Sequence, residues 1–405
     1  MLFSNFISAR LSSKNQSSFS SIVSKIAVGS VASGIFIILI SYAILLGFQR
    51  NIKNKIFSFG GHIQLTKYDL NNSLQENPIL INQVFLSELR KDEKIRSIST
   101  FSLKAGLIKT EEEVLGTVLK GIDNNFNISA FENNITKGRF IKFSDTAGSK
   151  EILVSEKIAK KLKLQLNEEV IVFFIQNPPR FRKLKIVGLF STGMDEFDES
   201  FILSDIKLIR KINNWNENMA GGYEIMINDF NQLDNVADTV FAKMDYDLGL
   251  EKITDKYITV FDWLVLLSQN VSIFLILIIV VASFNMISSL FIMIMERTQM
   301  IGILKALGAS NFLIVKIFFN RGILLIFWGL LIGNISAAVF CLLQYYFKIL
   351  PLDAENYYMN SVPIEWDWLI WLYTNVLLSL SMALIVFIPC LAIANIKPIR
   401  AIRFD

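Results

Sequence analysis

The sequence is short of the residues on which most enzyme sites depend. Its 405 residues include one histidine, His62, and two cysteines, Cys341 and Cys390. A histidine-based catalytic array, a zinc site with several ligands and a disulfide framework all need more of these residues. No segment fits the pattern G-x-x-x-x-G-K-[ST], so a phosphate-binding loop is also missing. We therefore expect a chain that is not an enzyme and holds no cofactor, and any ATP hydrolysis must come from another polypeptide.

Charged residues are scarce as well. They make up 19% of the chain, hydrophobic residues make up 52%, and the mean hydropathy is +0.45. These values are wrong for a soluble protein and indicate that part of the chain lies in lipid. The 40 lysines and arginines nearly balance the 36 acidic residues. Because the basic residues are also scattered, we expect no nucleic-acid partner.

Long uncharged runs predict the membrane helices, since a charge at the bilayer centre is costly and a helix needs about 20 residues to cross it. Four such runs occur, at residues 26–49, 263–295, 322–347 and 368–396. The first could be a cleaved signal peptide, but it is too long for one and lacks an A-x-A-like site before Arg50. The second is longer than a bilayer requires, so we expect it to project as a stalk.

The charges between the runs predict the orientation. Segments 1–25, 296–321 and 397–405 together carry ten lysines and arginines against two acidic residues. The loop 348–367 instead carries four acidic residues and one lysine. Basic residues accumulate on the cytoplasmic side of short loops. We therefore expect both termini and 296–321 in the cytoplasm, and residues 50–262 and 348–367 on the periplasmic side of a multi-pass inner-membrane protein.

Residues 50–262 have an ordinary charge content and a mixed pattern of strands and helices. Alternating or β-branched runs predict strands at 95–101, 114–120, 170–174, 183–190 and 223–227. Helical periodicity predicts helices at 81–91, 156–162 after Ser155, 205–212 after Ser204, and 232–244. The fold class is therefore a membrane α-helical protein with four transmembrane helices and a large extracytoplasmic α+β domain inserted between helices 1 and 2.

The cytoplasmic segment 296–321 contains a short amphipathic pattern. Met300, Ile303, Leu304 and Leu307 share one face of a helix. Gly308 supplies a stop, after which Ser310 can cap the next helix. The pattern alone leaves two alternatives open, a helix resting on lipid headgroups and a surface for a cytoplasmic partner.

The same segment carries a family resemblance. Residues 296, 297 and 301–310 resemble the signature of the FtsX-like, MacB-type ABC transporter permeases, and residues 397–403 resemble the ending of that family. The resemblance implies a MacB-like periplasmic core in residues 50–262 and a helix that docks into a separate ATPase, which binds ATP and Mg. The implied coupling residues are Glu296, Arg297, Ile301, Gly302, Leu304, Lys305, Leu307 and Gly308.

Further matches resemble the lipoprotein-releasing branch of this family, LolC and LolE. The matching segments, in order, are residues 6–10, Gly29, Gly34, 47–48, 55–56, 119–123, 138–139, 152–162, 187–193 with Asp198, and 284–285. This resemblance implies a transmembrane subunit that extracts lipoproteins from the inner membrane. The implied partners are a LolD-like ATPase, a second permease copy in a homodimer or heterodimer, the lipoprotein substrate and a LolA-like periplasmic carrier.

The loop 175–183 departs from the family pattern. In LolC an extended hook for the carrier occupies this place, and here the loop is short. Two prolines suit a stiff exposed turn, and the flanking side chains could meet a partner. The candidate carrier-binding residues are Pro178, Pro179, Arg180, Phe181 and Arg182. An ordinary hairpin loop is the alternative.

Lipoprotein extraction also needs an apolar groove. Acyl chains lose about 0.8 kcal/mol per CH₂ when they leave the bilayer, so some apolar surface must receive them. Candidate groove residues lie near the outer ends of the first two runs: Leu45, Leu46, Phe48, Trp263, Leu266, Leu267 and Phe274. For each residue, lipid contact or helix packing is the alternative.

The remaining predictions concern individual polar residues and alternative functions. Asn270, Asn285 and Asn334 lie inside the runs and are expected to join helices by hydrogen bonds. His62 follows Gly60 and Gly61 and is expected at a strand edge, not in catalysis. Two alternatives to lipoprotein release stay open. One is an FtsX-like transmission protein that activates a cell-wall hydrolase, and the other is a MacB-like efflux permease.

Overall fold

A computed structural model describes residues 18–68, 77–110, 113–144, 148–353, 357 and 359–392. These residues form two compact units. The described parts of 1–50, 263–351 and 361–405 make the first unit, and those of 51–262 and 352–360 make the second. Residues 6–10 and the tail 397–405, which contribute to the family resemblance, lie outside the described residues, as do residues 1–17 of the expected cytoplasmic segment 1–25.

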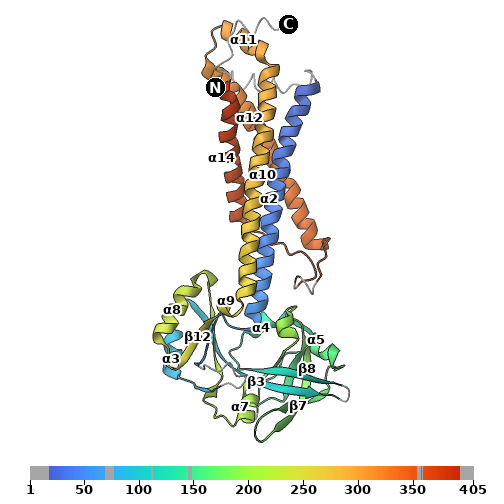
Figure 1. Ribbon diagram of the computed structural model, residues 1–405, viewed down its shortest axis with the longest axis vertical. Coiled ribbons are helices and arrows are strands. Elements are labelled where there is room, and N and C mark those ends of the chain that lie inside the picture. The colour runs from blue at the N-terminus through green and yellow to red at the C-terminus, as the bar shows by residue number, and fades with distance from the viewer. Residues whose placement is uncertain are drawn as a thin grey trace. The chain divides into compact units, whose positions relative to one another are not determined.

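The first unit consists of long helices. Each uncharged run falls on one of them, and all four helices are long and apolar enough to cross a membrane. Figure 1 shows the short helix α11 between the ends of α10 and α12. The helices are α2 (Ser18–Phe59), α10 (Ile258–Glu296), α11 (Thr298–Ala306), α12 (Asn311–Phe347) and α14 (Trp368–Ala392).

These helices continue past the uncharged runs. Helix α2 has 42 residues and α10 has 39. At about 1.5 Å per residue, each helix is roughly twice as long as the hydrocarbon core of a bilayer is thick. A charged residue ends an apolar run without ending a helix, and α2 continues through Arg50, Lys53 and Lys55. Residues 51–59 of α2 and 258–262 of α10 belong to the second unit.

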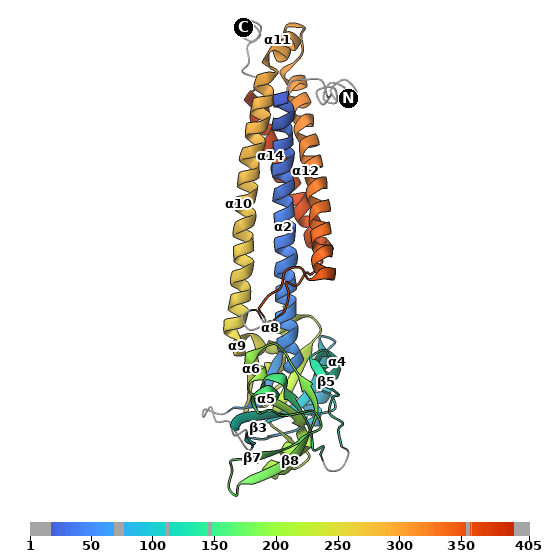
Figure 2. The same ribbon diagram turned by 90° about the vertical axis from the view of Figure 1, so that its right-hand side faces the viewer.

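Two glycines bring α12 close to α2. Gly329 and Gly333 are four residues apart on α12, and a Cβ at Gly329 would lie 2.7 Å from the Cβ of Val31. A Cβ at Gly333 would overlap with Ile35 and with the Ala32 carbonyl. The two helices lie side by side in Figure 2. Small residues at this spacing allow close helix packing in membranes, where van der Waals contact drives association.

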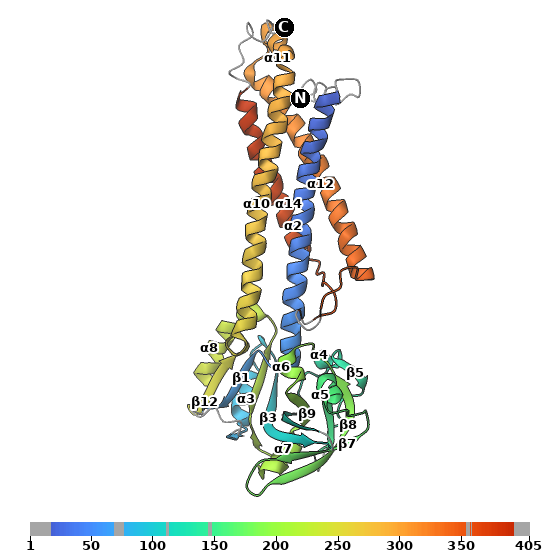
Figure 3. The same cartoon turned by 45° about the vertical axis from the view of Figure 1, so that its right-hand side comes forward.

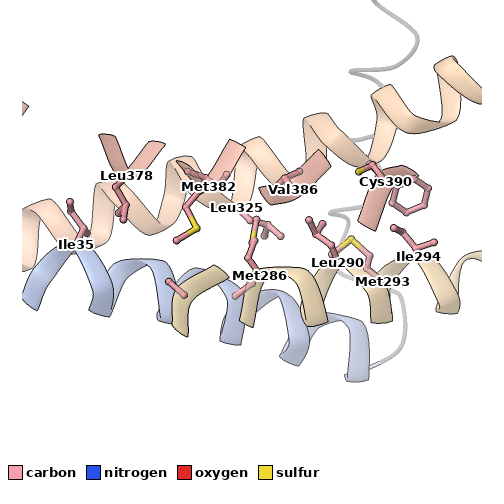
Figure 4. Packing of buried hydrophobic residues seen from close by; sticks show 14 of the residues in the cluster. Ile35, Met286, Leu290, Met293, Ile294, Leu325, Leu378, Met382, Val386 and Cys390 are labelled. Atoms are coloured by element: carbon pink, nitrogen blue, oxygen red, sulfur yellow. The ribbon is translucent and has the colours of Figure 1, made fainter. Parts of the chain in front are cut away.

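A continuous apolar core joins α10, α12 and α14. Figure 4 shows Met286 and Leu290 of α10 beside Leu325 of α12, with Met382 and Val386 of α14 completing the layer. All of these side chains are buried. Cys341 and Cys390 are also buried in this unit as free thiols.

Polar side chains add specific links between the helices. Asn334 and Asn375 exchange amide hydrogen bonds of 2.7 and 3.0 Å between α12 and α14. Trp371 Nε1 donates to the same Asn334 Oδ1 at 2.6 Å. Asn285 donates to Ser30 Oγ at 2.9 Å, which joins α10 to α2. Two of the three asparagines predicted as interhelical links therefore have this role. Asn270 is exposed.

Gly47 gives the loop after α12 room to pack on α2. A Cβ at Gly47 would lie 2.5 Å from the Pro363 carbonyl oxygen. The Glu365 amide donates to Ala43 O at 3.0 Å, and the Glu365 carboxylate pairs with Arg50. A glycine at position 47, in the matching segment 47–48, is therefore required sterically.

The second unit is α+β, as predicted. Its elements are β1 (Ile63–Lys67), β2 (Ile79–Leu80), α3 (Gln83–Leu89), β3 (Ile95–Lys109), β4 (Val114–Ile122), α4 (Ile128–Glu132), β5 (Ile135–Gly138), β6 (Glu151–Ser155), α5 (Glu156–Lys161), β7 (Glu169–Phe174), β8 (Arg180–Phe190), α6 (Asp195–Asp198), β9 (Phe201–Asp205), α7 (Ile206–Asn213), β10 (Met219–Ala220), β11 (Gly222–Ile227), η1 (Phe230–Gln232), α8 (Leu233–Lys243), β12 (Leu248–Lys252) and α9 (Ile253–Lys256).

One mixed sheet holds the second unit together. Its strand order is β12-β1-β11-β3-β4-β9-β6-β8-β5, with β7 paired to β3 and β8. The 15-residue strand β3 pairs with β11 along its first half and with β4 along its second. Figure 3 shows α3, α8 and β12 on one side of this unit and α5, β7 and β8 on the other. Strand β3 therefore belongs to both halves of the domain.

Local sequence signals explain several elements of this unit. All five predicted strands and all four predicted helices overlap observed ones. Ser155 caps α5 as predicted, since its hydroxyl accepts from the Ile158 amide at 3.0 Å. Helix α7 differs, because Asp205 is its N-cap instead of Ser204. Ser204 is fully buried on β9, a strand that the sequence did not predict.

His62 is a buried neutral side chain at the turn between α2 and β1. Its Nδ1 accepts from the Ile227 amide at 2.9 Å, and its ring lies edge-on to Phe57 at 4.2 Å. Burial, together with the charge of Arg96, lowers the pKa of His62 to about 4. The preceding Gly61 is required sterically, since a Cβ there would lie 2.9 Å from the Ile225 nitrogen.

The α2–α12 contact predicts a contrast between two glycine substitutions. Gly333→Ala places a methyl group against Ile35 and should destabilise the chain by about 1–3 kcal/mol. Gly29→Ala on α2 meets nothing within 4 Å and should be neutral or stabilising. Thermal unfolding of the two purified variants in detergent measures the difference. Equal melting temperatures would contradict the packing.

The environment of His62 predicts a pH dependence. Between pH 6.5 and about 4 the unfolded chain protonates this imidazole and the folded chain does not. Stability from this group is therefore fully present above pH 6.5, and about 3 kcal/mol of it is lost by pH 4. His62→Gln, which cannot titrate, should show a correspondingly weaker dependence of the unfolding free energy on pH. An identical dependence in both proteins would refute the assignment.

Candidate docking and substrate surfaces

Helix α11 is held by hydrogen bonds at both of its ends. The Thr298 hydroxyl donates to Met295 O at 2.5 Å, and the Ile301 amide donates to Arg297 O at 2.9 Å. Gly308 has a φ of +88°, which ends the helix in the left-handed region. The Ser310 hydroxyl then accepts from the Leu313 amide at 3.3 Å and caps α12. The stop and the cap are where the sequence predicts them.

The two faces of α11 have different environments. Ile301 is fully buried, Gly302 is buried, and Leu304 packs partly against the helical core. The opposite face is apolar and exposed, with Leu307 80% exposed and Ile303 50% exposed. The predicted amphipathic face is therefore divided, because Leu304 packs inward and Ile303 and Leu307 face out.

The structure separates the predicted coupling residues into two groups. Ile301 and Gly302 are internal and position the helix. Glu296, Leu307 and Gly308 are exposed, and Arg297, Leu304 and Lys305 are half-buried. Met295 and Phe312, on the adjoining helix ends, are also exposed apolar side chains and were not among the predicted coupling residues. The signal for Phe312 was its place in the first turn of α12, which leaves it uncovered.

The loop with two prolines is the tip of the hairpin formed by β7 and β8. Phe174 pairs with Arg180, so residues 175–179 form the turn, and Pro178 and Pro179 are exposed. Arg180 Nη1 donates to Ile212 O at 2.6 Å and to Asn214 Oδ1 at 2.9 Å. Gln176 Nε2 also donates to Ile212 O, at 3.2 Å. Arg180 therefore binds the C-terminal end of α7, an interaction that sequence spacing alone could not identify.

One face of this hairpin is apolar and exposed. The rings of Phe173 and Phe181 lie 6.2 Å apart in a cross-strand pair, and Phe181 is 63% exposed. Ile171 is exposed on β7 at an alternate position that shares this face, and Ile175, the first residue of the turn, is also exposed. Arg182 is half-buried and donates to its neighbour's carbonyl, Phe181 O, at 2.9 Å. Of the candidate carrier residues, Phe181 is the one with a large apolar surface available.

The candidate groove residues lie on α2 and α10 of the first unit. Leu46, Phe48, Trp263 and Leu267 are half-buried, Leu45 is buried, and Leu266 and Phe274 are exposed. Gln49 Nε2 lies 3.5 Å from Leu264 O, which brings the two helix segments near each other. In the most apolar window of α10 only 6% of the residues are buried, against 50% in that of α2. Helix α10 therefore offers the larger uncovered apolar surface.

A polar cleft in the second unit is lined by acidic side chains that have structural roles. It encloses about 300 Å³ beside Asp123 and Asp205. Asp123 Oδ2 accepts from the Thr100 amide and hydroxyl at 2.8 and 2.7 Å, although burial still raises the pKa of this carboxyl. Asp205 accepts from the Ser149 and Lys207 amides. Within the described part of the chain, no group of three or more His, Cys, Asp or Glu residues could hold a metal ion.

Two family models match the sequence. The MacB-like periplasmic core domain matches residues 24–240, which is more than half of the chain. The FtsX-like permease C-terminal domain matches residues 272–398, which include α11 and α12.

The chain is similar to curated proteins over most of its length. It is 26% identical to the lipoprotein-releasing system transmembrane protein LolC of Buchnera aphidicola subsp. Schizaphis graminum, over 86% of this chain and 85% of that protein. It is 20% identical to LolE of Haemophilus influenzae, over 88% of each chain. Among solved structures, the periplasmic region of MacB from Actinobacillus actinomycetemcomitans matches with 13% identity and a TM-score of 0.34, covering 49% of this chain and 91% of that chain.

The hairpin geometry predicts different effects for its two neighbouring arginines. Arg180→Met removes a charged donor from the end of α7, at a cost of about 1–3 kcal/mol. Hydrogen exchange of the α7 amides should then be faster by about tenfold or more. Arg182→Met is the matched control and should leave this exchange unchanged. Equal exchange in both variants would remove the assigned role of Arg180.

Proposed function

Since this chain belongs to the FtsX-like, MacB-type permease superfamily and, within it, to the LolC and LolE family, we propose that it extracts lipoproteins from the inner membrane and passes them to a periplasmic carrier. As a family member it is a permease subunit of an ABC transporter and not itself the ATPase. The observation that carries the finer proposal is the uncovered apolar face of α10 in a chain similar to LolC over most of its length.

The proposed topology places residues 50–262 in the periplasm, between the first and second membrane helices, with both termini and α11 in the cytoplasm. The basic excess of segments 296–321 and 397–405 supports it. Aromatic side chains at the C-terminal end of α12 and the N-terminal end of α14 support a membrane interface at these helix ends, because tyrosine and tryptophan are enriched at both interfaces. Tyr345, Tyr346 and Trp368 are exposed there.

Helix α11 is the proposed docking site for a LolD-like ATPase, which binds ATP and Mg. In an aqueous compartment the exposed Ile303 and Leu307 would be an unfavourable apolar surface unless a partner covered them. Arg297 and Lys305 flank this surface and can select an acidic rim on the partner. The buried Ile301 anchors the helix, so force applied at Leu307 reaches the core of the first unit.

The uncovered face of α10 supports two further contacts within the membrane. Its exposed side chains include Ile273, Phe274 and Leu277. A second permease copy, in a homodimer or a heterodimer, would cover part of this face. The remainder, near Trp263 and Leu267, would receive the acyl chains of a lipoprotein, because an apolar groove is the surface that lowers the cost of leaving the bilayer.

The β7–β8 hairpin is the proposed contact for a LolA-like carrier. Phe181, Phe173 and Ile175 give it an apolar face, and Lys183 lies beside them with its side chain more than half exposed. Arg180 donates a hydrogen bond to the C-terminal end of α7 and so fixes the position of the hairpin. The short turn therefore presents a sheet face, in place of the extended hook of LolC.

The docking surface predicts the effect of a single charge. Leu307→Asp places a carboxylate at the centre of the apolar face and should weaken binding of the cognate ATPase by about 2–4 kcal/mol. Co-purification and titration of the ATPase against the permease in detergent measure this loss. Val114→Asp, an exposed apolar position in the second unit, is the matched control. Undiminished binding by Leu307→Asp would exclude α11 as the docking helix.

The groove predicts which positions meet the substrate. A photo-reactive amino acid at Phe274 or Leu267 should capture an acylated lipoprotein in membranes containing the assembled complex. The same probe at Trp328, an exposed position on α12, is the control for lipid-facing surfaces. Capture at 274 and 267 should fall when ATP drives release. Equal capture at 328, or capture at none of the positions, would reject the groove.

A further inference from the structure

The second unit contains a buried ion pair between two strands of its sheet. Lys120 Nζ on β4 lies 2.6 Å from Glu224 Oε1 on β11, and the side chains are 3% and 2% exposed. Removing two charges from water is costly, so such a pair contributes little net stability compared with apolar residues of similar size. Its position therefore has to be explained by what else it contacts.

The lysine of the pair holds the end of α2. Lys120 Nζ donates to the carbonyl of Phe59, the last residue of that helix. Carbonyl groups in the last turn lack partners within the helix and carry the negative end of its dipole, so a cation there is favourable. The ammonium also lies 5.0 Å from the centre of the Phe59 ring. Helix α2 is thereby attached to β4.

The glutamate of the pair is connected by hydrogen bonds to a residue just before the start of α10. Gln64 Nε2 on β1 donates to Glu224 Oε1 at 2.9 Å, and Lys256 Nζ donates to Gln64 Oε1 at 2.6 Å. Lys256 ends α9, two residues before α10 begins. These polar groups border a small cavity of about 40 Å³, which Phe59 and Tyr257 also line.

An aromatic stack connects the same two helix ends. The rings of Phe59 and Phe197 are stacked with centroids 4.3 Å apart, and Phe197 lies edge-on to Tyr257 at 5.6 Å. Tyr257 directly precedes α10, and burial raises its pKa. The end of α2 and the start of α10 are therefore joined twice, once through the ion pair and once through the stack.

We propose that the network of Lys120, Glu224, Gln64 and Lys256 is a coupling junction, which passes movements of α2 and α10 to the sheet of the second unit. The idea rests on the proposed function, in which a separate ATPase moves these helices. A displacement of α2 alone would break the hydrogen bond between the buried Lys120 ammonium and the Phe59 carbonyl, and a buried polar group that loses a hydrogen bond costs free energy. Moving β4 and β11 together with the helix avoids this cost, so the strands follow.

The test removes both charges at once. Lys120→Met with Glu224→Leu leaves no single buried charge, so the domain should still fold. We expect the complex to assemble with its ATPase and to hydrolyse ATP at a similar rate, while lipoprotein released per ATP falls about tenfold. If the double variant yields no assembled complex, Lys120→Met with Glu224→Gln replaces it, because the introduced side-chain amide keeps an acceptor for Gln64.

A matched control removes an exposed ion pair from the same unit. Lys157 and Asp195 are 2.8 Å apart, with side chains 38% and 45% exposed. Lys157→Met with Asp195→Leu should leave the release per ATP unchanged. A loss equal to that of the Lys120 variant would show that any change in this unit disturbs transport, and would overturn the specific role of the junction.

A second measurement does not depend on the substrate. Hydrogen exchange of the β4 and β11 amides is compared between nucleotide-free and vanadate-trapped complexes. The unmodified complex should show a nucleotide-dependent change that the Lys120–Glu224 variant lacks. The same change in both would overturn the junction, as would equal release per ATP. If the unmodified complex releases no lipoprotein, the proposed function fails and the exchange data alone judge the junction.

Discussion

The close approach of α12 to α2 at Gly329 and Gly333 determines which helix surfaces are left for other molecules. Half of the most apolar window of α2 is buried, since α10 also packs on this helix, so α2 is the central helix of the first unit. Helix α10 then contributes one side to the core and keeps a long uncovered face. Under the proposed function, this is the face that meets lipid, a second permease copy or an acyl chain in the membrane.

The polar side chains that form specific hydrogen bonds lie apart from the proposed binding surfaces. Apolar side chains and helix ends form the proposed contacts at α11, at α10 and at the β7–β8 hairpin. The conspicuous polar groups are instead occupied within the chain, since Asp123, Arg180 and His62 each satisfy backbone groups. This division agrees with a subunit that changes shape under the action of a separate ATPase and transfers a lipid-anchored cargo without altering it.

Sequence alone predicted what depends on local pattern and composition. Uncharged runs located the four long helices, while Gly308 and Ser310 marked the break before α12. It could not predict interactions that join distant segments. Arg180 was interpreted as a candidate partner residue, because its hydrogen-bond partner on α7 lies more than 30 positions away in the sequence. The ion pair of Lys120 was not predicted, because Glu224 lies more than 100 positions away. The predicted bounds fell short of the ends of α2 and α10, although the second run was predicted to be longer than a bilayer requires, because charged residues end an apolar run without ending a helix.

The central claim is that this chain and a separate ATPase release lipoproteins from a membrane. The most direct measurement is the release of a labelled triacylated lipoprotein from proteoliposomes that contain the permease and its cognate ATPase. We expect release only when ATP, the ATPase and a periplasmic carrier are all present, with no hydrolysis by the permease alone. ATP hydrolysis by the assembled complex without any release would contradict it, and activation of a cell-wall hydrolase under the same conditions would identify the chain as an FtsX-like transmission protein.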